Sequence, residues 1–211
     1  MTPELPIGPV LSALDLAGIG LFAATGAVAA ARAKQTLVTF AFFALATGVG
    51  GGTVRDLLIG APVFWIADAR PLVACLVIAL LVWVTPARIW HGKALDWLDA
   101  VGMAAYAVFG AAKALSFGVP PVPAVIMGIF TACLGGIIRD VLAGEPSIIL
   151  RPELYVTAAA LSAALFVGLT AAGLMLPVAA AIAALAGFAL RALAILKGLA
   201  LPVYRGGDGP S

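Results

Sequence analysis

Long apolar runs divide the chain into stretches, and short segments with charged residues, glycine or proline separate them. The hydrocarbon core of a bilayer is roughly 30 Å thick, so a helix needs about 20 apolar residues to cross it. Seven stretches reach this length, at 11–31, 37–59, 71–90, 98–117, 123–143, 153–173 and 177–199. We therefore predict an all-α membrane protein with seven transmembrane helices, the last two joined by a turn at 173–177.

Composition supports a lipid environment and excludes one class of partner. Of the 211 residues, 64% are hydrophobic and 10% are charged, against about 25% charged residues in ordinary soluble domains. The net charge is only +2, and the basic residues are scattered, whereas a nucleic-acid surface needs clustered phosphate contacts. We expect membrane lipids around the chain and no nucleic acid as a partner.

An internal repeat is the strongest sequence signal. Residues 14–62 align without a gap on residues 98–146, at a constant offset of 84. Arg55 and Asp56 fall on Arg139 and Asp140, and a Gly-Gly pair precedes both. Alanine-rich composition alone would match alanines, not these residue types. The chain therefore reads as one transmembrane domain, 1–211, with repeat one at 11–90, repeat two at 98–173 and an extra helix at 177–199.

The two repeats are predicted to cross the membrane in opposite senses. Each repeat holds three helices, an odd number, so the second copy enters from the other side. Loops on one predicted side carry Arg32, Lys34, Arg88, Lys93, Arg151, Lys197 and Arg205, and the other side carries mainly Arg70. Because cytoplasmic loops are rich in Lys and Arg, we place the N-terminus outside and the C-terminus in the cytoplasm.

Glycines gather at equivalent places in the second and fifth stretches. They are Gly48, Gly50, Gly51, Gly52, Gly135 and Gly136. Glycine costs about 1 kcal/mol relative to alanine in a helix interior, so such a cluster marks either an unwound or kinked helix or close packing of small residues. Recurrence in both repeats, each time three residues before Arg-Asp, favours broken helices. Unwound backbone at membrane depth must be buried in protein or line a watery cavity, so we expect a pore or binding cavity between the repeats.

Charged residues lie at equivalent ends of these stretches. Side chains at adjacent helical positions do not face each other, so we expect each arginine of the two Arg-Asp pairs to find its partner on another helix. The inverted topology predicts two pairings, Asp15 with Arg55 and Asp99 with Arg139. These groups, with Asp56 and Asp140, either gate the two mouths of a pore or cap helix ends and reach the headgroups.

Lys113 breaks the symmetry between the repeats, because its equivalent is Ala29. It lies in an apolar stretch, where an unpaired ammonium is costly. We expect it to line the pore, the alternative being that it reaches the membrane interface.

The sequence offers no catalytic or metal-binding constellation. The single histidine, His91, lies in a predicted loop, so there is no Ser-His pair or histidine cluster within the membrane. Asp56 and Asp140 are predicted at opposite faces and cannot share a proton as a protease pair does. We expect no enzyme activity, no cofactor and no metal site.

The doubled pattern of GGGTVRD with GAPVFW, and of GAAKAL followed by GGIIRD, resembles prokaryotic members of the trimeric intracellular cation channel family. The resemblance implies an inverted three-plus-three helix repeat with a seventh helix, a homotrimer in the prokaryotic inner membrane, and a potassium-permeable pore in each protomer. It also implies that the second and fifth helices are kinked at their glycines and frame the pore, with Arg55, Arg139 and Lys113 beside it.

A mechanism follows as an expectation. Carbonyl groups exposed at unwound glycines would coordinate a monovalent cation, with hydroxyl groups from Thr47 and Thr131, at matched positions. The alternatives are a secondary transporter of a small solute such as glycine, since inverted repeats with broken helices also serve alternating access, and a structural membrane protein without transport.

Overall fold

The computed structural model describes residues 9–90, 92–202 and 204, without the side chains of residues 9–14 and 87. Its elements in chain order are α1 (Pro9–Arg32), α2 (Leu37–Leu58), α3 (Phe64–Ala67), α4 (Arg70–Val84), η1 (Ala87–Trp90), α5 (Ala94–Ser116), α6 (Pro121–Ala143), η2 (Ile148–Leu150), α7 (Val156–Ala171) and α8 (Leu176–Lys197). Five helices, α1, α2, α5, α6 and α8, are long and apolar enough to cross a membrane, and α4 and α7 are shorter apolar helices. The described part of the chain contains no named strand, only an isolated bridge between Glu153 and Ala200.

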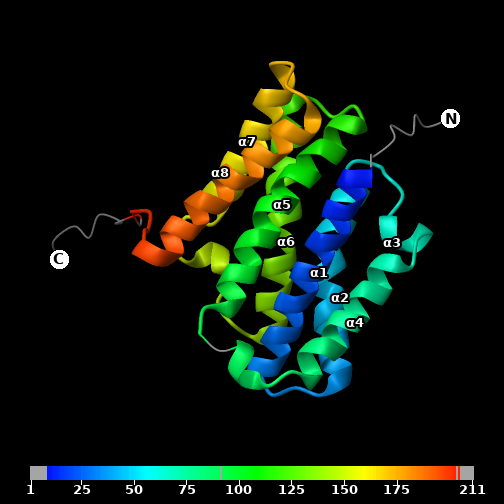
Figure 1. Cartoon of the computed structure of the whole chain (residues 1–211), viewed down its shortest axis with the longest axis vertical. Coiled ribbons are helices and arrows are strands. Elements are labelled where there is room, and N and C mark those ends of the chain that lie inside the picture. Colours follow the sequence, from blue (N-terminus) through cyan, green and yellow to red (C-terminus); the bar gives the residue numbers. More distant parts are fainter. Residues whose placement is uncertain (1–8, 91, 203, 205–211) are drawn as a thin grey trace, which may run out of the picture.

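The helices of the two repeats run in opposite directions. In Figure 1, α1 runs downward, α2 upward and α4 downward, whereas α5 runs upward, α6 downward and α7 upward. The helix that follows the two repeats, α8, returns downward beside α7 and α5. We call the two ends of the bundle in this view the upper end, where α1 begins, and the lower end, where it finishes.

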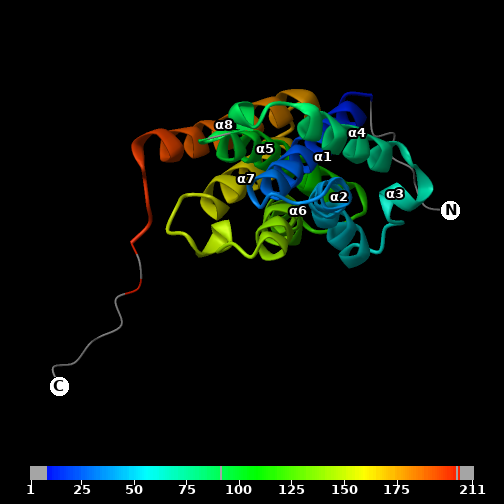
Figure 2. The same cartoon turned by 90° about the horizontal axis from the view of Figure 1, so that it is seen from below.

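The first helices of the two repeats, α1 and α5, occupy the centre of the bundle. Figure 2, seen from below, places them between the other helices. Several alanines on both helices, such as Ala23 and Ala107, are fully buried, which lets neighbouring helices approach closely. The outer helices instead expose large apolar side chains, as in Leu80 and Leu81 of α4 and Leu185 of α8. An apolar outer face of this kind is the surface that lipid covers.

The third helix of each repeat is shorter than the sequence predicts. α4 ends at Val84 instead of reaching residue 90, because Pro86 restricts Thr85 to an extended conformation. α7 begins at Val156 instead of 153, because Glu153 pairs with Ala200 in the bridge and its carboxylate lies 2.7 Å from Arg191 on α8. The short helix α3, which follows α2, is absent from the predicted elements.

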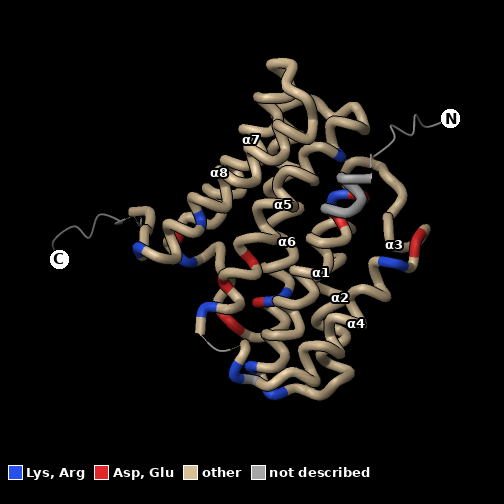
Figure 3. The backbone as a smooth tube through the Cα atoms, viewed as in Figure 1, with Lys and Arg blue, Asp and Glu red and all other residues tan. Residues whose placement is uncertain are grey.

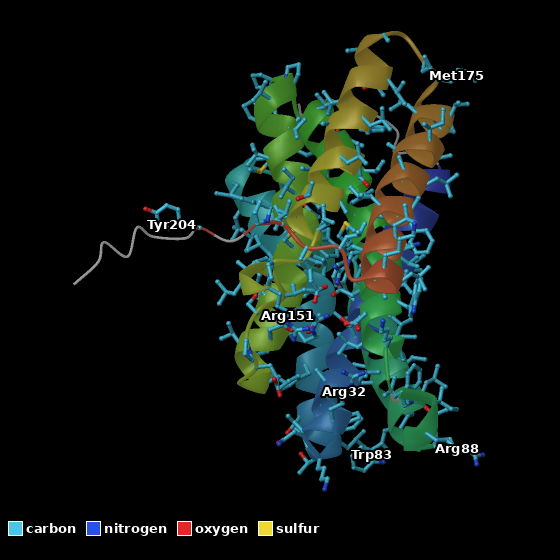
Figure 4. The ribbon with its side chains drawn as sticks, turned by 90° about the vertical axis from the view of Figure 1, so that its left-hand side faces the viewer. Arg32, Trp83, Arg88, Arg151, Met175 and Tyr204 are labelled. Atoms are coloured by element: carbon cyan, nitrogen blue, oxygen red, sulfur yellow. The ribbon has the colours of Figure 1, made fainter. Side chains whose placement is uncertain are left out.

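Basic residues gather at the lower end. Figure 4 places Arg32 and Arg88 there and Met175 at the opposite end, and Figure 3 shows the same concentration of Lys and Arg along the backbone. The Arg32 guanidinium donates to the Gly92 carbonyl at 2.9 Å, and the Lys93 ammonium donates to the Ile195 carbonyl at 2.9 Å. These bonds join the ends of α1 and α8 to the segment between η1 and α5. Arg205 and His91 lie outside the described residues.

Candidate functional site

The glycines of α2 and α6 form the contact between these helices, and the prediction that they break the helices is wrong. Both helices are continuous through their glycines. A Cβ atom on Gly51 would lie 2.5 Å from the Thr131 carbonyl oxygen, and one on Gly135 would lie 2.8 Å from the Thr47 carbonyl oxygen. Since 51 and 135, and 47 and 131, are equivalent positions, the two contacts are related by the repeat. The glycines serve close backbone packing, the alternative reading of the pattern.

The other predicted glycines also meet neighbours. A Cβ on Gly48 would lie 2.7 Å from the Cys75 sulfur, one on Gly50 2.5 Å from Ile138 Cδ1, one on Gly52 2.7 Å from Phe64 Cε1, and one on Gly136 3.3 Å from the Tyr155 hydroxyl. Both threonines at the crossing are buried. The Thr131 hydroxyl donates to the Met127 carbonyl at 2.6 Å, whereas the Thr47 hydroxyl has no hydrogen-bond partner within the described residues.

At the upper end, two basic groups share one carboxylate. We call Arg55, Asp56 and Lys113 the upper cluster. The Arg55 guanidinium lies 2.7 Å from Asp56 Oδ1, and the Lys113 ammonium lies 2.8 Å from the same oxygen. Arg55 and Asp56 are almost completely buried, and the Lys113 side chain is 10% exposed. Lys113 is thus neither unpaired nor free in the membrane.

At the lower end, two carboxylates share one basic group. We call Asp99, Arg139 and Asp140 the lower cluster. Arg139 Nη1 lies 2.6 Å from Asp99 Oδ1, and Nη2 lies 2.9 Å from Asp140 Oδ1. All three residues are buried. The structure therefore contains the predicted pairing between Asp99 and Arg139.

The expectation that each arginine finds its partner on another helix holds for Arg139, whose partner Asp99 lies on α5, and is wrong for Arg55. Adjacent residues do pair in both repeats, because the long arginine side chain curves back so that its Nε donates to the neighbouring aspartate, at 2.8 Å in Arg55 and 2.9 Å in Arg139. The expected pairing of Asp15 with Arg55 is absent among the described residues. The Arg55 guanidinium instead lies over the Phe109 ring, 5.1 Å from its centroid, and 6.0 Å from that of Phe64. The positions equivalent to Phe109 and Phe64 carry Thr25 and Ile148, so neither ring has an aromatic counterpart beside Arg139.

Each aspartate of the Arg-Asp pairs also holds a loop. Asp56 Oδ2 accepts the Phe64 amide at 3.1 Å, and Asp140 Oδ2 accepts the Ile148 amide at 2.8 Å. Phe64 begins α3 and Ile148 begins η2, and both lie eight residues after their aspartate. Sequence reasoning missed this role. The available signal was the equal spacing in both repeats of an aspartate followed by a Gly-x-Pro segment.

Two cavities lie at opposite ends of the bundle. The upper cavity, of about 190 Å³, is lined by Asp15, Leu16, Ile19, Phe64, Asp68, Arg70, Pro71, Phe109 and Lys113. The lower cavity, of about 230 Å³, is lined by Ala29, Arg32, Ala33, Leu95, Asp96, Arg139, Asp140, Ala143, Glu145, Ile148 and Arg151. Each cavity thus reaches one charged cluster. Neither lining includes a glycine of α2 or α6, so among the described residues the tight crossing of these helices lies outside both cavities.

Carboxylates in both cavities can attract cations. Asp15 in the upper cavity forms no ion pair within the described part of the chain. The side-chain hydrogen bond from Arg70 lowers the pKa of the Asp68 carboxyl below its usual range, so Asp68 is charged at neutral pH. Among the described residues, no group of three His, Cys, Asp or Glu side chains is placed to hold a metal ion.

Comparison with known proteins identifies the family to which the chain belongs. A protein-family model described as "Glycine transporter" matches residues 12–87 and 96–171, two matches offset by 84 residues. The inner membrane protein YadS of Escherichia coli (strain K12) is 40% identical over 148 residues, 69% of this chain and 72% of that protein. A Vibrio cholerae membrane protein is 39% identical over 155 residues, and the match covers 71% of this chain but only 64% of that relative.

The similar solved structures name the kind of membrane protein more specifically. The trimeric intracellular cation (TRIC) channel orthologue from Rhodobacter sphaeroides is 42% identical, with a TM-score of 0.85 over 91% of this chain and 100% of that chain. The chain belongs to the prokaryotic TRIC channel family. The TRIC fold confirms the prediction of seven membrane helices as an inverted three-plus-three repeat with a seventh helix. The relatives are named as channels or membrane proteins, in agreement with the expectation of no enzyme.

Proposed function

We propose that this TRIC protein is a cation channel that passes potassium and other monovalent cations through a pore between the two repeats of each protomer. The observation that carries the proposal is the pair of cavities at opposite ends, each reaching an equivalent charged cluster beside α1 and α5. The similarity to solved TRIC cation channels supports the same activity.

The charge arrangement is compatible with a cation. Both arginines near the pathway are paired, Arg139 with the carboxylates of Asp99 and Asp140, and Arg55 with Asp56, which it shares with Lys113. Asp15 and Asp68 in the upper cavity, and Asp96 and Glu145 in the lower, supply further oxygens. Carboxylates lining a mouth raise the local concentration of cations.

The route of the ion differs from the one expected from sequence. Because α2 and α6 are unbroken, their carbonyls are engaged in helical hydrogen bonds and are not displayed as a ring. The oxygens available to a cation are the carboxylates of the cavities and, between them, the partnerless hydroxyl of Thr47. We assign the present conformation to a closed state, which opens when the repeats move at the crossing of α2 and α6.

Assembly and orientation are part of the proposal. We infer a homotrimer in the prokaryotic inner membrane, with the N-terminus outside and the basic lower end in the cytoplasm. Chemical cross-linking in native membranes tests the trimer, and membrane-impermeant thiol labelling of a cysteine introduced at Lys34 or at Gly118 tests the orientation. Labelling of the Lys34 position in intact cells would contradict it.

The decisive experiment is a planar bilayer recording with the purified full chain and a tenfold potassium chloride gradient. A cation-selective channel shows single-channel steps and a reversal potential approaching the ~59 mV expected for one monovalent ion. A reversal potential near zero, or of the sign for chloride, would overturn cation selectivity.

A glycine carrier is the second candidate, because the matching family model bears that description and inverted repeats also suit alternating access. Proteoliposomes loaded with buffer and exposed to radiolabelled glycine separate the two. Saturable uptake without single-channel currents supports a carrier, and currents without glycine uptake support the channel.

A Lys113→Gln variant is expected to raise potassium conductance at low salt. The substitution removes one of the two positive charges that line the upper cavity, leaving its two aspartates with Arg70 alone. Because screening weakens such fields, the increase at 0.1 M potassium chloride is expected to shrink at 1 M. Lys34→Gln, at the lower end and outside both cavity linings, is the control. An equal increase in both variants would remove the local explanation.

A further inference from the structure

Two aromatic rings at equivalent positions stack on each other in the middle of the bundle. Phe22 on α1 and Tyr106 on α5 are 84 residues apart, the offset of the repeat. Their ring centroids lie 5.3 Å apart and the rings are nearly parallel, at 15°. Both side chains are buried, 1% and 3% exposed. Each repeat therefore contributes one ring to a central pair.

Each ring rests on a glycine of the opposite repeat. A Cβ on Gly18 of α1 would lie 2.7 Å from Tyr106 Cε1, and one on Gly102 of α5 would lie 3.2 Å from Phe22 Cε2. Gly18 and Gly102 are also 84 residues apart. Phe22 reaches α6 as well, since a Cβ on Gly135 would lie 3.3 Å from its Cδ1. The pair thus touches the crossing at which α2 of repeat one packs against α6 of repeat two.

The pair lies between the two cavities along both central helices. On α1, the upper cavity is lined by residues 15, 16 and 19 and the lower by 29, 32 and 33, so Phe22 falls between them. On α5, the lower cavity is lined by residues 95 and 96 and the upper by 109 and 113, so Tyr106 falls between them. The Tyr106 hydroxyl donates to the Asp15 carbonyl at 3.4 Å, which ties its ring to the wall of the upper cavity.

We propose that the Phe22–Tyr106 stack is the gate that separates the two cavities and must part before an ion can pass. Apolar constrictions block ions because water leaves them, and stacked rings fill the space with rigid surface. Because one ring belongs to each repeat, a movement of one repeat against the other separates them. The lower cluster lies wholly within repeat two and stays intact, whereas the Lys113–Asp56 pair of the upper cluster joins the two repeats and lengthens in that movement. This inference rests on the proposed channel function.

The test is a comparison of single-channel open probability in planar bilayers for wild type, Phe22→Ala, Tyr106→Ala and the double variant. We expect each single variant to raise open probability at least threefold, and the double variant to be open most of the time. Phe166→Ala is the matched control, since Phe166 is fully buried but lies on α7, which contributes no residue to either cavity lining. It is expected to lower thermal stability without opening the channel.

Phe22→Met and Tyr106→Met keep an apolar, flexible side chain in the core, and they replace the alanine variants if those do not fold. They are expected to raise open probability to a smaller extent. A conducting wild type whose folded variants all keep its open probability overturns the gate and leaves the channel function intact. A wild type without currents overturns the proposed function, and the gate with it.

Discussion

Arg139→Met is expected to lower the thermal stability of the protein more than any other single change in a charged residue. It leaves Asp99 and Asp140 buried, 1% and 8% exposed, without the guanidinium that lies 2.6 and 2.9 Å from them. Removing one partner of a buried ion pair costs about 3–5 kcal/mol. For a chain of this size the loss corresponds to a fall in Tm of roughly 6–20 °C, measured by size-exclusion chromatography of detergent-solubilised protein after heating.

Arg70→Met is the matched control, because the Arg70 side chain is 84% exposed and its ion pair with Asp68 is held in solvent. Exposed ion pairs of this kind contribute little to the stability of the fold, so the Tm of Arg70→Met should stay within error of wild type. Adding Asp99→Asn to Arg139→Met removes one stranded carboxylate and should recover part of the loss. Equal melting of Arg139→Met and Arg70→Met would show that the lower cluster does not stabilise the fold.

The contrast between the two clusters shows where repeat symmetry predicts contacts and where it does not. The inverted topology of the repeats correctly predicts the contact between Asp99 and Arg139. The same reasoning applied to Asp15 and Arg55 fails, because Phe109 and Phe64 hold the guanidinium and Lys113 supplies a second cation to Asp56. Those three residues have no chemical equivalent in the other repeat, and they decide the pairing.

The sequence did not predict the loop contacts of Asp56 and Asp140, for a different reason. Their partners are the backbone amides of Phe64 and Ile148, and every residue other than proline carries such an amide. A side chain that binds backbone therefore leaves no complementary residue type in the sequence. Only the equal spacing in the two repeats could have indicated it.

The glycines illustrate a limit of pattern reasoning. A missing Cβ permits both an unwound helix and close approach of two helices, and the sequence is the same in either case. The atom that faces the glycine in the folded protein decides between these two roles. Here the opposing atoms are the carbonyl oxygens of Thr131 and Thr47, on the other helix of the pair, so the recurrence of the cluster in both repeats reflects a shared contact.

Gly51→Ala is expected to destabilise the protein, although alanine is the better helix former. Its Cβ would lie 2.5 Å from the Thr131 carbonyl oxygen, and a backbone atom held in a helix cannot move aside as a flexible side chain can. Overpacking of this kind costs about 1–3 kcal/mol, a fall in Tm of roughly 2–12 °C. Gly135→Ala, with 2.8 Å to the Thr47 oxygen, should show the same sign and a smaller fall.

Gly20→Ala on α1 is the control, because a Cβ there meets nothing within 4 Å. It removes the cost of a helical glycine, about 1 kcal/mol, so its Tm should rise. The three variants then separate the two explanations for the glycine cluster. If the glycines serve helix flexibility, alanine should stabilise the helix at Gly51 as it does at Gly20. If they serve the contact between α2 and α6, the sign must reverse at the crossing, and the loss should follow the order of the opposing distances.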